Sequence, residues 1–310
     1  MRAVSLHRDV IVVTSQLLQA HCTIVRGPAA SIVPSPSEGL SVTTHGPGAG
    51  PTGGGARARE GEPGDPELEH GAGAGNGEET FVIDSPVLPE ELELLGALVQ
   101  QAGFPQPRGL LATHADFDHV LGPLAFPEAT LGCAESSAER LHVEPGAQQR
   151  ELRRFDEGLL IERPRPLALS AVQALAVPGR CDVGDAELEL HGATGHTIDG
   201  MAIWIPWARV LVAGDYLSSV ELPGLGEGPG MLDAYLATLE RLHPLVALAE
   251  HVVPGHGPVL DREAALRVLD EDVVYLQALR ERAGDAELPA KRRSKVQREL
   301  HEQNVARMHV

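Results

Sequence analysis

The feature that most constrains this chain is a dense group of polar side chains between Thr113 and His119. The potential metal ligands there are His114, Asp116, Asp118 and His119. The apolar residues 109–112 precede them and are typical of a buried strand, whose end directs side chains into a loop. The pattern therefore predicts a metal-binding site at the end of a strand.

Polar residues follow other predicted strands in the same way. These strands are expected at residues 80–83, 186–191, 209–213 and 252–253, and the residues that follow them or their short loops are Asp84, His196, Asp215 and His256. Strand ends on one edge of a layered fold converge in space, so residues far apart in sequence can share a site. Imidazoles and carboxylates suit zinc, iron or manganese, and two neighbouring ions would use all of these groups.

The order of the expected elements indicates an α/β fold. Strands are expected at residues 9–13 and 21–25, a helix at 89–102, a strand at 110–112, and helices at 231–242, 261–282 and 288–308. Alternating strands and helices favour a layered arrangement. The basic run at residues 291–295 is interpreted as a solvated helix face.

Residues 27–79 differ in composition from the rest of the chain. They consist largely of Gly, Pro, Ala, Ser and acidic residues, and almost none of them could fill a core. We therefore predict a disordered insertion within one domain at residues 1–265. Residues 266–310 are expected to form a C-terminal helical extension.

Charge and cysteine content restrict the partners. A net charge of −19 argues against nucleic acid, which requires clustered basic residues. No stretch has the roughly 18 to 20 apolar residues that a membrane span requires, so no membrane partner is expected. Cys22, Cys133 and Cys181 are scattered without a CxxC pair, which indicates a reducing, cytoplasmic location. No sequence feature predicts an oligomeric state.

Taken together, the polar residues resemble the landmarks of the metallo-β-lactamase-fold superfamily. That family has an Asp after an early strand, an H-x-H-x-D-H loop, a Gly-His-Thr, a Gly-Asp and a late Gly-His. The corresponding residues here are Asp84, His114 to His119, Gly195-His196-Thr197, Gly214-Asp215 and Gly255-His256. The resemblance extends from Asp9 to about Ala265 and implies an αββα sandwich with metals at one edge of two facing sheets.

The resemblance also implies a role for each residue. The ligands it implies are His114, Asp116 and His196 for a first ion, Asp118, His119 and His256 for a second, and Asp215 as a bridge. Asp84 would hold ligands in place by hydrogen bonds. The expected cofactors are two divalent ions, zinc or iron, with manganese as an alternative.

Position 116 departs from the family pattern, which has His where this chain has Asp116. A third carboxylate lowers the nominal charge of a two-ion centre from +2 to +1, and its oxygen favours a harder or higher-valent metal. Flavodiiron proteins of the same superfamily carry a glutamate in this slot and hold iron, but no room for their flavodoxin-like domain follows His256. Alternatively, Asp116 is too short to reach a metal, which leaves the second site as the tight one.

The leading prediction is a metal-dependent hydrolase that acts on a small-molecule substrate. A metal-bound hydroxide would cleave an ester, thioester, lactone or phosphoester bond, and Asp118 would orient the nucleophile or accept its proton. The alternatives are a non-haem iron oxidoreductase, sulfur-dioxygenase-like or di-iron, and a metal-containing binding protein without turnover. Tyr216 is a further catalytic candidate that could donate to a substrate oxygen or, instead, satisfy its hydroxyl within the core.

Overall fold

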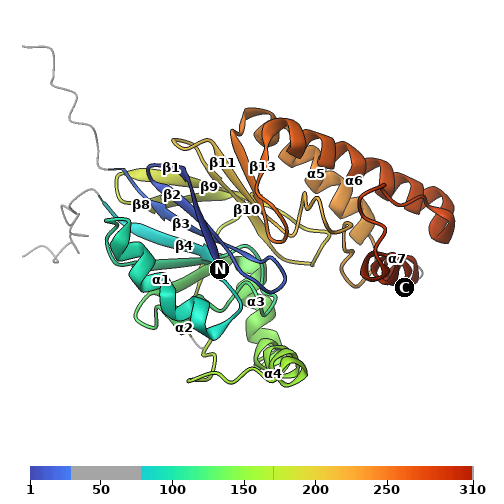
Figure 1. Cartoon of the computed structure of the whole chain (residues 1–310). Helices are drawn as coiled ribbons and strands as arrows, with labels where there is room; N and C mark the ends of the chain where they lie inside the picture. The colour runs from blue at the N-terminus through green and yellow to red at the C-terminus, as the bar shows by residue number, and fades with distance from the viewer. Residues whose placement is uncertain (29–77, 170, 309–310) are drawn as a thin grey trace, which may run out of the picture.

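Two β-sheets form the centre of the molecule in this computed structural model, which describes residues 1–28, 78–169 and 171–308 (Figure 1). Within these ranges the first sheet has the order β1 (Arg2–His7), β2 (Val10–Thr14), β3 (His21–Arg26), β4 (Thr80–Asp84), β5 (Gly109–Ala112), β6 (Thr130–Ala134) and β7 (Val172–Leu175). The second has the order β13 (Leu260–Asp261), β12 (His251–Pro254), β11 (Val210–Gly214), β10 (Met201–Ile205), β9 (Ala186–Gly192) and β8 (Gly179–Val183). Almost all of the predicted insertion lies outside the described residues.

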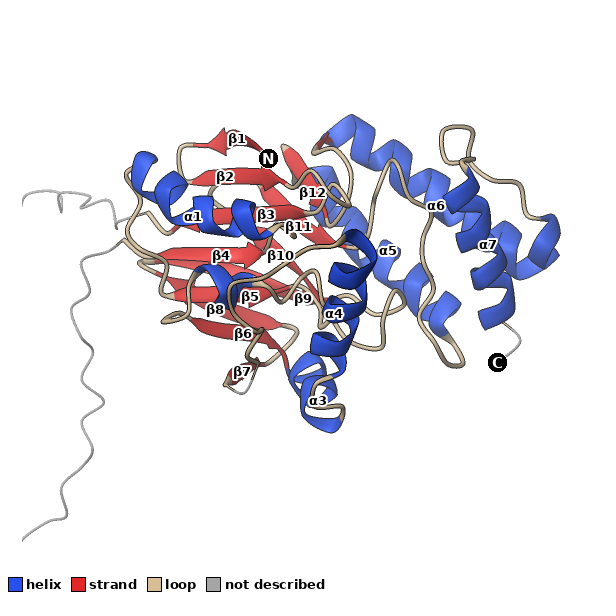
Figure 2. Ribbon diagram, turned by 60° about the horizontal axis from the view of Figure 1, so that its bottom comes forward, coloured by secondary structure: helices blue, strands red, loops and turns tan. Residues whose placement is uncertain are grey.

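Helices cover the outer face of each sheet. The described helices are α1 (Pro89–Gln101), α2 (Gly122–Ala125), α3 (Glu135–Val143), α4 (Ala147–Leu159), α5 (Met231–Leu248), α6 (Arg262–Arg282) and α7 (Lys295–Arg307), with the 3-10 turn η1 (Ala283–Asp285) after α6. Figure 1 shows α1 and α2 on one side of the sheets and α5 and α6 on the other, while α7 lies beside α6 in Figure 2. The predicted αββα sandwich is confirmed.

The alternation of side chains along the strands explains these layers. In β4, Val82 packs on the helical side whereas Ile83 enters the core between the sheets. In β10, Ile203 enters that same core whereas Trp204 faces the layer formed by α5 and α6. Both faces of these strands are buried, because successive residues point to opposite faces of a sheet and both faces are covered.

The structure corrects several predicted boundaries. Strands β1 and β8 were not expected, α5 continues through Pro244 to Leu248, and α7 begins only at Lys295. The basic run is solvated only in part: Lys291, Arg293 and Lys295 are exposed, but Arg292 is buried and its guanidinium lies 2.5 Å from the carboxylate of Asp272. Of these four residues only Lys295 belongs to a helix, α7. A buried charge requires a partner of opposite charge, and α6 supplies it.

The C-terminal helices pack on the sandwich. Helix α6 begins at Arg262 and runs without a break past residue 265, so the predicted domain boundary does not coincide with the end of an element. Buried residues of α6, including Val268 and Leu276, belong to the same apolar cluster as Trp204 of β10. None of the described helices is both long and apolar enough to span a membrane.

Candidate metal centre

The predicted ligands meet at one edge of the two sheets. Strands β4, β5 and β6 are parallel, as are β11 and β12, so the carboxyl ends within each group point the same way. Asp84 ends β4, residues 113–119 follow β5, and Asp215 follows β11. His256 follows β12, and His196 lies between β9 and β10. All seven predicted ligands come together here.

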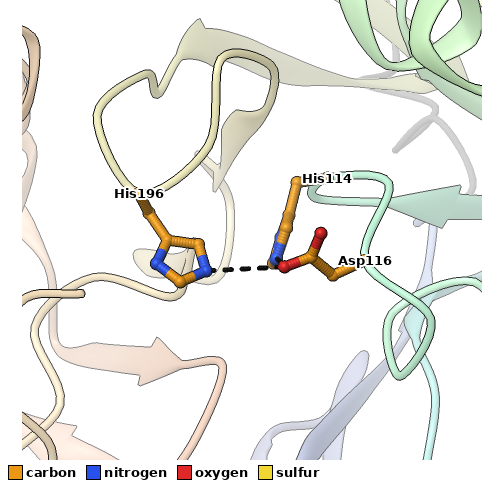
Figure 3. A group of neighbouring side chains, drawn as sticks. All are labelled: His114, Asp116 and His196. Carbon is orange, nitrogen blue, oxygen red and sulfur yellow. Dashed lines mark ion pairs between the residues drawn. The ribbon is translucent and has the colours of Figure 1, made fainter. Parts of the chain in front are cut away.

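The first cluster consists of His114, Asp116 and His196 (Figure 3). Oδ2 of Asp116 lies 3.4 Å from Nε2 of His114 and 3.7 Å from Nε2 of His196. The carboxylate of Asp116 therefore lies beside both imidazoles, which is the placement that a ligand of the same ion requires. The side chains of Asp116 and His196 are 28% and 22% exposed, so this cluster opens towards solvent.

The second cluster consists of Asp118, His119 and His256, all of which are buried. Oδ2 of Asp118 lies 3.4 Å from Nε2 of His256 and 3.9 Å from Nε2 of His119. This cluster is therefore more enclosed than the first.

Asp215 lies between the two clusters and offers one oxygen to each. Its Oδ2 is 3.1 Å from Nε2 of His196 in the first cluster. Its Oδ1 is 3.2 Å from Nε2 of His119 and 3.3 Å from Nε2 of His256 in the second. A carboxylate in this position is suited to bridging two cations.

Each histidine of the centre is oriented through its Nδ1 atom, which leaves Nε2 facing inward. The Nδ1 partners are Thr113 Oγ1 for His114 (3.2 Å), Asp84 Oδ2 for His119 (3.0 Å), Gly224 O for His196 (3.0 Å) and Leu18 O for His256 (3.0 Å). Partners of this kind fix the tautomer and ring orientation of a metal-binding histidine.

Asp84 organises the start of the loop that carries most of the ligands. Its carboxylate accepts hydrogen bonds from the backbone N–H and the hydroxyl of Thr113, at 2.8 and 2.9 Å, and also contacts His119. Asp84 is buried and has a φ of 56°, a left-handed conformation that a non-glycine residue rarely adopts. This backbone conformation accompanies a carboxylate that faces Thr113 and His119.

Two glycines make room for the centre. A Cβ atom on Gly255 would lie 1.9 Å from Oδ1 of Asp215, so only glycine fits before His256. Gly195 has a φ of +125°, and a Cβ there would lie 2.4 Å from the backbone of Tyr235. The glycines that precede both histidines are therefore steric requirements.

The buried atoms of the centre that make no hydrogen bond fit a bound cation. Within the described residues, Nε2 of His114, Nε2 of His119 and Oδ1 of Asp215 are buried and make no hydrogen bond. Buried polar atoms are rarely left without a partner, because losing water costs about 1 to 3 kcal/mol per group. Imidazole nitrogens and carboxylate oxygens directed at one another match the donor set of zinc or iron.

The pKa values of the ionisable groups in the centre also fit a bound cation. Burial alone would lower the pKa of His196 and His256, but the carboxylate of Asp215 overrides it and raises these pKa values to about 10 and about 9. Burial would raise the pKa of Asp215, but His256, His119 and His196 hold it well below its usual range. Without a metal, protons supply the positive charge that a bound cation would otherwise bring.

Two residues that sequence reasoning did not identify support Asp116. Nη2 of Arg140, in α3, donates to Oδ1 of Asp116 at 2.7 Å, and its Nη1 donates to Oδ1 of Asp199 at 2.9 Å. Asp199 is fully buried, three residues after His196. No spacing pattern links Arg140 to the ligands, so the sequence offered no signal for this contact.

The C-terminal helix α7 also reaches the first cluster. Asn304 is fully buried, its Nδ2 donates to the carbonyl of Pro223 at 2.7 Å, and its Oδ1 accepts from the N–H of Leu225 at 2.9 Å. These two residues flank Gly224, whose carbonyl orients His196. Asn304 thus holds the segment that sets the direction of the imidazole.

Tyr216 occupies a supporting position. Its hydroxyl accepts a hydrogen bond from the backbone N–H of His196 at 3.1 Å, and its ring packs on Tyr235. Tyr216 is buried, and burial raises its pKa. This placement does not support the predicted donation to a substrate and favours a role in holding the loop of His196.

A cavity of about 300 Å³ adjoins the centre. His196, Asp215 and His256 line it, and α7 contributes Glu299 and Leu300. No lysine or arginine is among the described residues that line it.

Comparison with known proteins agrees with this geometry. A family model described as the metallo-beta-lactamase superfamily matches residues 74–277. A solved metallo-beta-lactamase from Pontibacter korlensis is 15% identical with a TM-score of 0.52, and it covers 89% of this chain and 98% of its own. The DIM-1 metallo-beta-lactamase is 16% identical with a TM-score of 0.50, covering 87% of this chain and 94% of its own. These likenesses show the fold.

Curated relatives match over shorter segments. A "Beta-lactamase-like protein 2 homolog" of Caenorhabditis elegans is 35% identical over 83 residues, which is 26% of this chain and 25% of that protein. A "Metallo-beta-lactamase type 2" of Bacillus sp. (strain 170) is 32% identical over 92 residues, which is 28% of this chain and 35% of that protein. The matches thus span about a quarter to a third of these relatives. Because the family model covers more than half of the chain, the chain belongs to the metallo-beta-lactamase superfamily, whose members bind divalent metals, typically zinc.

Proposed function

We propose that this chain is a metal-dependent hydrolase with a two-ion centre. The proposed ligands are His114, Asp116 and His196 for the first ion, Asp118, His119 and His256 for the second, and Asp215 for both. The observation that carries the proposal is the set of buried nitrogen and oxygen atoms that make no hydrogen bond and face one another in the centre. Superfamily membership supports a metal-dependent hydrolase in general, although some members do not hydrolyse their substrates.

The protein's own groups would prepare the site for hydrolysis. When bound, divalent ions would supply a water that ionises near neutral pH and would polarise the bond under attack. The Nδ1 contacts keep the imidazoles directed inward, so little reorganisation is needed when substrate arrives. Asp118 is proposed to orient the attacking water and to accept its proton, because its carboxylate lies at the centre beside His256.

The cavity beside the centre favours a particular class of substrate. Its lining combines apolar surface from Leu222 and Leu300 with the carboxylates of Glu221 and Glu299. Negative charge on the wall repels anions, and the described lining residues include no lysine or arginine to offset it. We therefore favour carboxylic esters, thioesters and lactones over phosphoesters.

Replacing Asp118 tests the proposed proton acceptor. We expect Asp118→Asn to reduce turnover of an ester or lactone by about 100-fold or more, because general-base catalysis contributes about 10²- to 10⁴-fold. Turnover is measured with each protein at its own measured metal content. An Asp118→Asn protein that retains its metal and full turnover would contradict the assignment.

The oxygen ligand at Asp116 favours a second candidate, a non-haem iron oxidoreductase on the same fold. Carboxylate oxygen suits iron better than a third imidazole does, and Oδ2 of Asp116 faces both histidines of the first cluster. Metal analysis and the visible spectrum of protein purified without added metal separate the two functions. Colourless, zinc-loaded protein supports the hydrolase, whereas stoichiometric iron with a visible absorption band supports the oxidoreductase.

A further inference from the structure

Arg140 joins two carboxylates at the outer side of the first cluster. One guanidinium nitrogen donates to Oδ1 of Asp116 at 2.7 Å, and the other terminal nitrogen donates to Oδ1 of Asp199 at 2.9 Å. The Arg140 side chain is 22% exposed and that of Asp199 is fully buried. Hydrogen bonds between ionised groups are among the strongest in proteins, especially where solvent is partly excluded.

The contact with Arg140 gives the two oxygens of the Asp116 carboxylate different partners. Oδ1 is held by the guanidinium, while Oδ2 faces Nε2 of His114 and of His196. A short carboxylate without such a partner could rotate so that neither oxygen faces the imidazoles. The guanidinium therefore selects the orientation in which Asp116 can act as a ligand.

Asp199 holds Arg140 in turn. Its carboxylate accepts from the hydroxyl of Ser137 at 2.6 Å and from the backbone N–H of Ala115 at 2.9 Å, in addition to Arg140. Ala115 lies between His114 and Asp116 in the ligand loop. Asp199 therefore connects α3 to the ligand loop through hydrogen bonds to both.

We propose that Arg140 is a positioning residue. It allows Asp116 to act as a metal ligand at a position where the family pattern has histidine. It fixes the Asp116 carboxylate with one oxygen towards the metal, and Asp199 fixes Arg140. The inference rests on the proposed function in that it takes Asp116 to be a metal ligand. Arg140 is not an anchor for a substrate anion, because both of its terminal nitrogens are already bound to carboxylates.

The positive charge of Arg140 also favours Asp116 as a metal ligand, but it contributes less than the orientation does. A third carboxylate lowers the nominal charge of a two-ion centre by one, and the guanidinium brings one positive charge back. Asp199 draws on the same guanidinium, so the compensation is shared between the two acids. Orientation is therefore the main contribution, and a lysine, which cannot form the two-pronged bridge, should replace Arg140 poorly.

Zinc affinity in a double-mutant cycle tests the proposal without reference to activity. Each protein is titrated with zinc against a chromophoric chelator, and the two binding classes are assigned with His196→Ala and His256→Ala. We expect Arg140→Met to weaken the first-cluster class by about 10- to 100-fold, as is typical for residues behind a ligand, and to leave the second class unchanged. Arg140→Lys should fall between Arg140→Met and the native protein.

The cycle is completed by placing Arg140→Met in the Asp116→His background, where the effect of Arg140 on zinc affinity should shrink below about threefold. Arg26→Met is the matched control, since the Arg26 side chain is likewise 22% exposed and two of its nitrogens donate to Asp9. Arg26 pairs with Thr80, at the end of β4 opposite Asp84 and the centre. The proposal would be overturned if Arg140→Met reduced the zinc affinity of the first cluster equally in the native and Asp116→His backgrounds. It would also be overturned if Arg140→Met or Arg140→Lys left that affinity unchanged in the native background. A native protein that binds no zinc would instead contradict the proposed function.

Discussion

The two clusters of the metal centre are built from similar side chains but supported in different ways. Asp118, His119 and His256 are buried, and their partners are Asp84 and the backbone carbonyl of Leu18. The first cluster is partly exposed and depends on Arg140 of α3 and on a loop that α7 holds.

Substitutions are therefore expected to affect the metal affinities of the two clusters differently. The second cluster is set by strand ends that pair directly within the sheets, so its geometry follows from the fold itself. The ligands of the first cluster also follow strands, but Asp116 and the loop behind His196 are held by side chains of α3 and α7. We expect the second to bind metal more tightly and the first to be the more easily altered.

Removing the group shared by both clusters should have the largest effect. We expect Asp215→Asn to weaken zinc binding in both classes by more than the roughly 10- to 100-fold typical of residues behind a ligand, because each oxygen of Asp215 faces one cluster. Zinc titration with a competing chelator measures this. Loss of only one class would show that Asp215 does not link the two halves.

Breaking the buried ion pair of the C-terminal layer should have the next largest effect. Arg292→Met leaves Asp272 buried without its counter-charge, which should reduce the free energy of unfolding by about 3 to 5 kcal/mol. Arg293→Met is the control, because Arg293 and Glu287 form an exposed pair whose loss should cost about 0 to 1 kcal/mol. Equal costs for the two variants, measured by denaturant unfolding, would contradict the assigned role of Arg292.

Loosening the loop behind His196 should affect one cluster only. Asn304→Ala removes the hydrogen bonds on either side of Gly224, so the first zinc class should weaken by about tenfold while the second is unchanged. Gln297→Ala, on the same helix, removes the acceptor for Leu222 N–H and provides the control. If Asn304→Ala reduced the zinc affinity of both classes equally, α7 would not act specifically through His196.

Tyr216→Phe should have the smallest effect. It removes the acceptor for the backbone N–H of His196, which should cost about 1 to 3 kcal/mol of unfolding free energy. Turnover of an ester or lactone should fall by less than about tenfold, because the hydroxyl is occupied within the loop. A loss of 100-fold or more with unchanged metal content would restore Tyr216 as a catalytic residue.

The sequence predicted the architecture and the meeting of the ligands because both depend on local patterns. Apolar runs such as residues 109–112 mark buried strands, and side chains that follow parallel strands converge whatever lies between them. The layered α/β arrangement and the convergence of the polar side chains followed from this reasoning, whereas the αββα sandwich followed from the family resemblance.

The supporting contacts could not be predicted, because no periodicity or spacing encodes them. Arg140 lies 24 residues from Asp116, and Asn304 lies 81 residues from Pro223. Each pairing depends on how a helix packs against a loop. The same limit explains Arg292, whose place in a basic run suggested that it was exposed to solvent. Its partner Asp272 lies in α6, whereas Arg292 lies in the loop before α7.

The two-ion centre itself is tested by zinc stoichiometry and affinity in the native chain, His196→Ala and His256→Ala. We expect two ions per native chain in two affinity classes, with the weaker class lost in His196→Ala and the tighter class lost in His256→Ala. A single ion per chain, or one class lost equally in both variants, would contradict a two-ion centre with unequal halves.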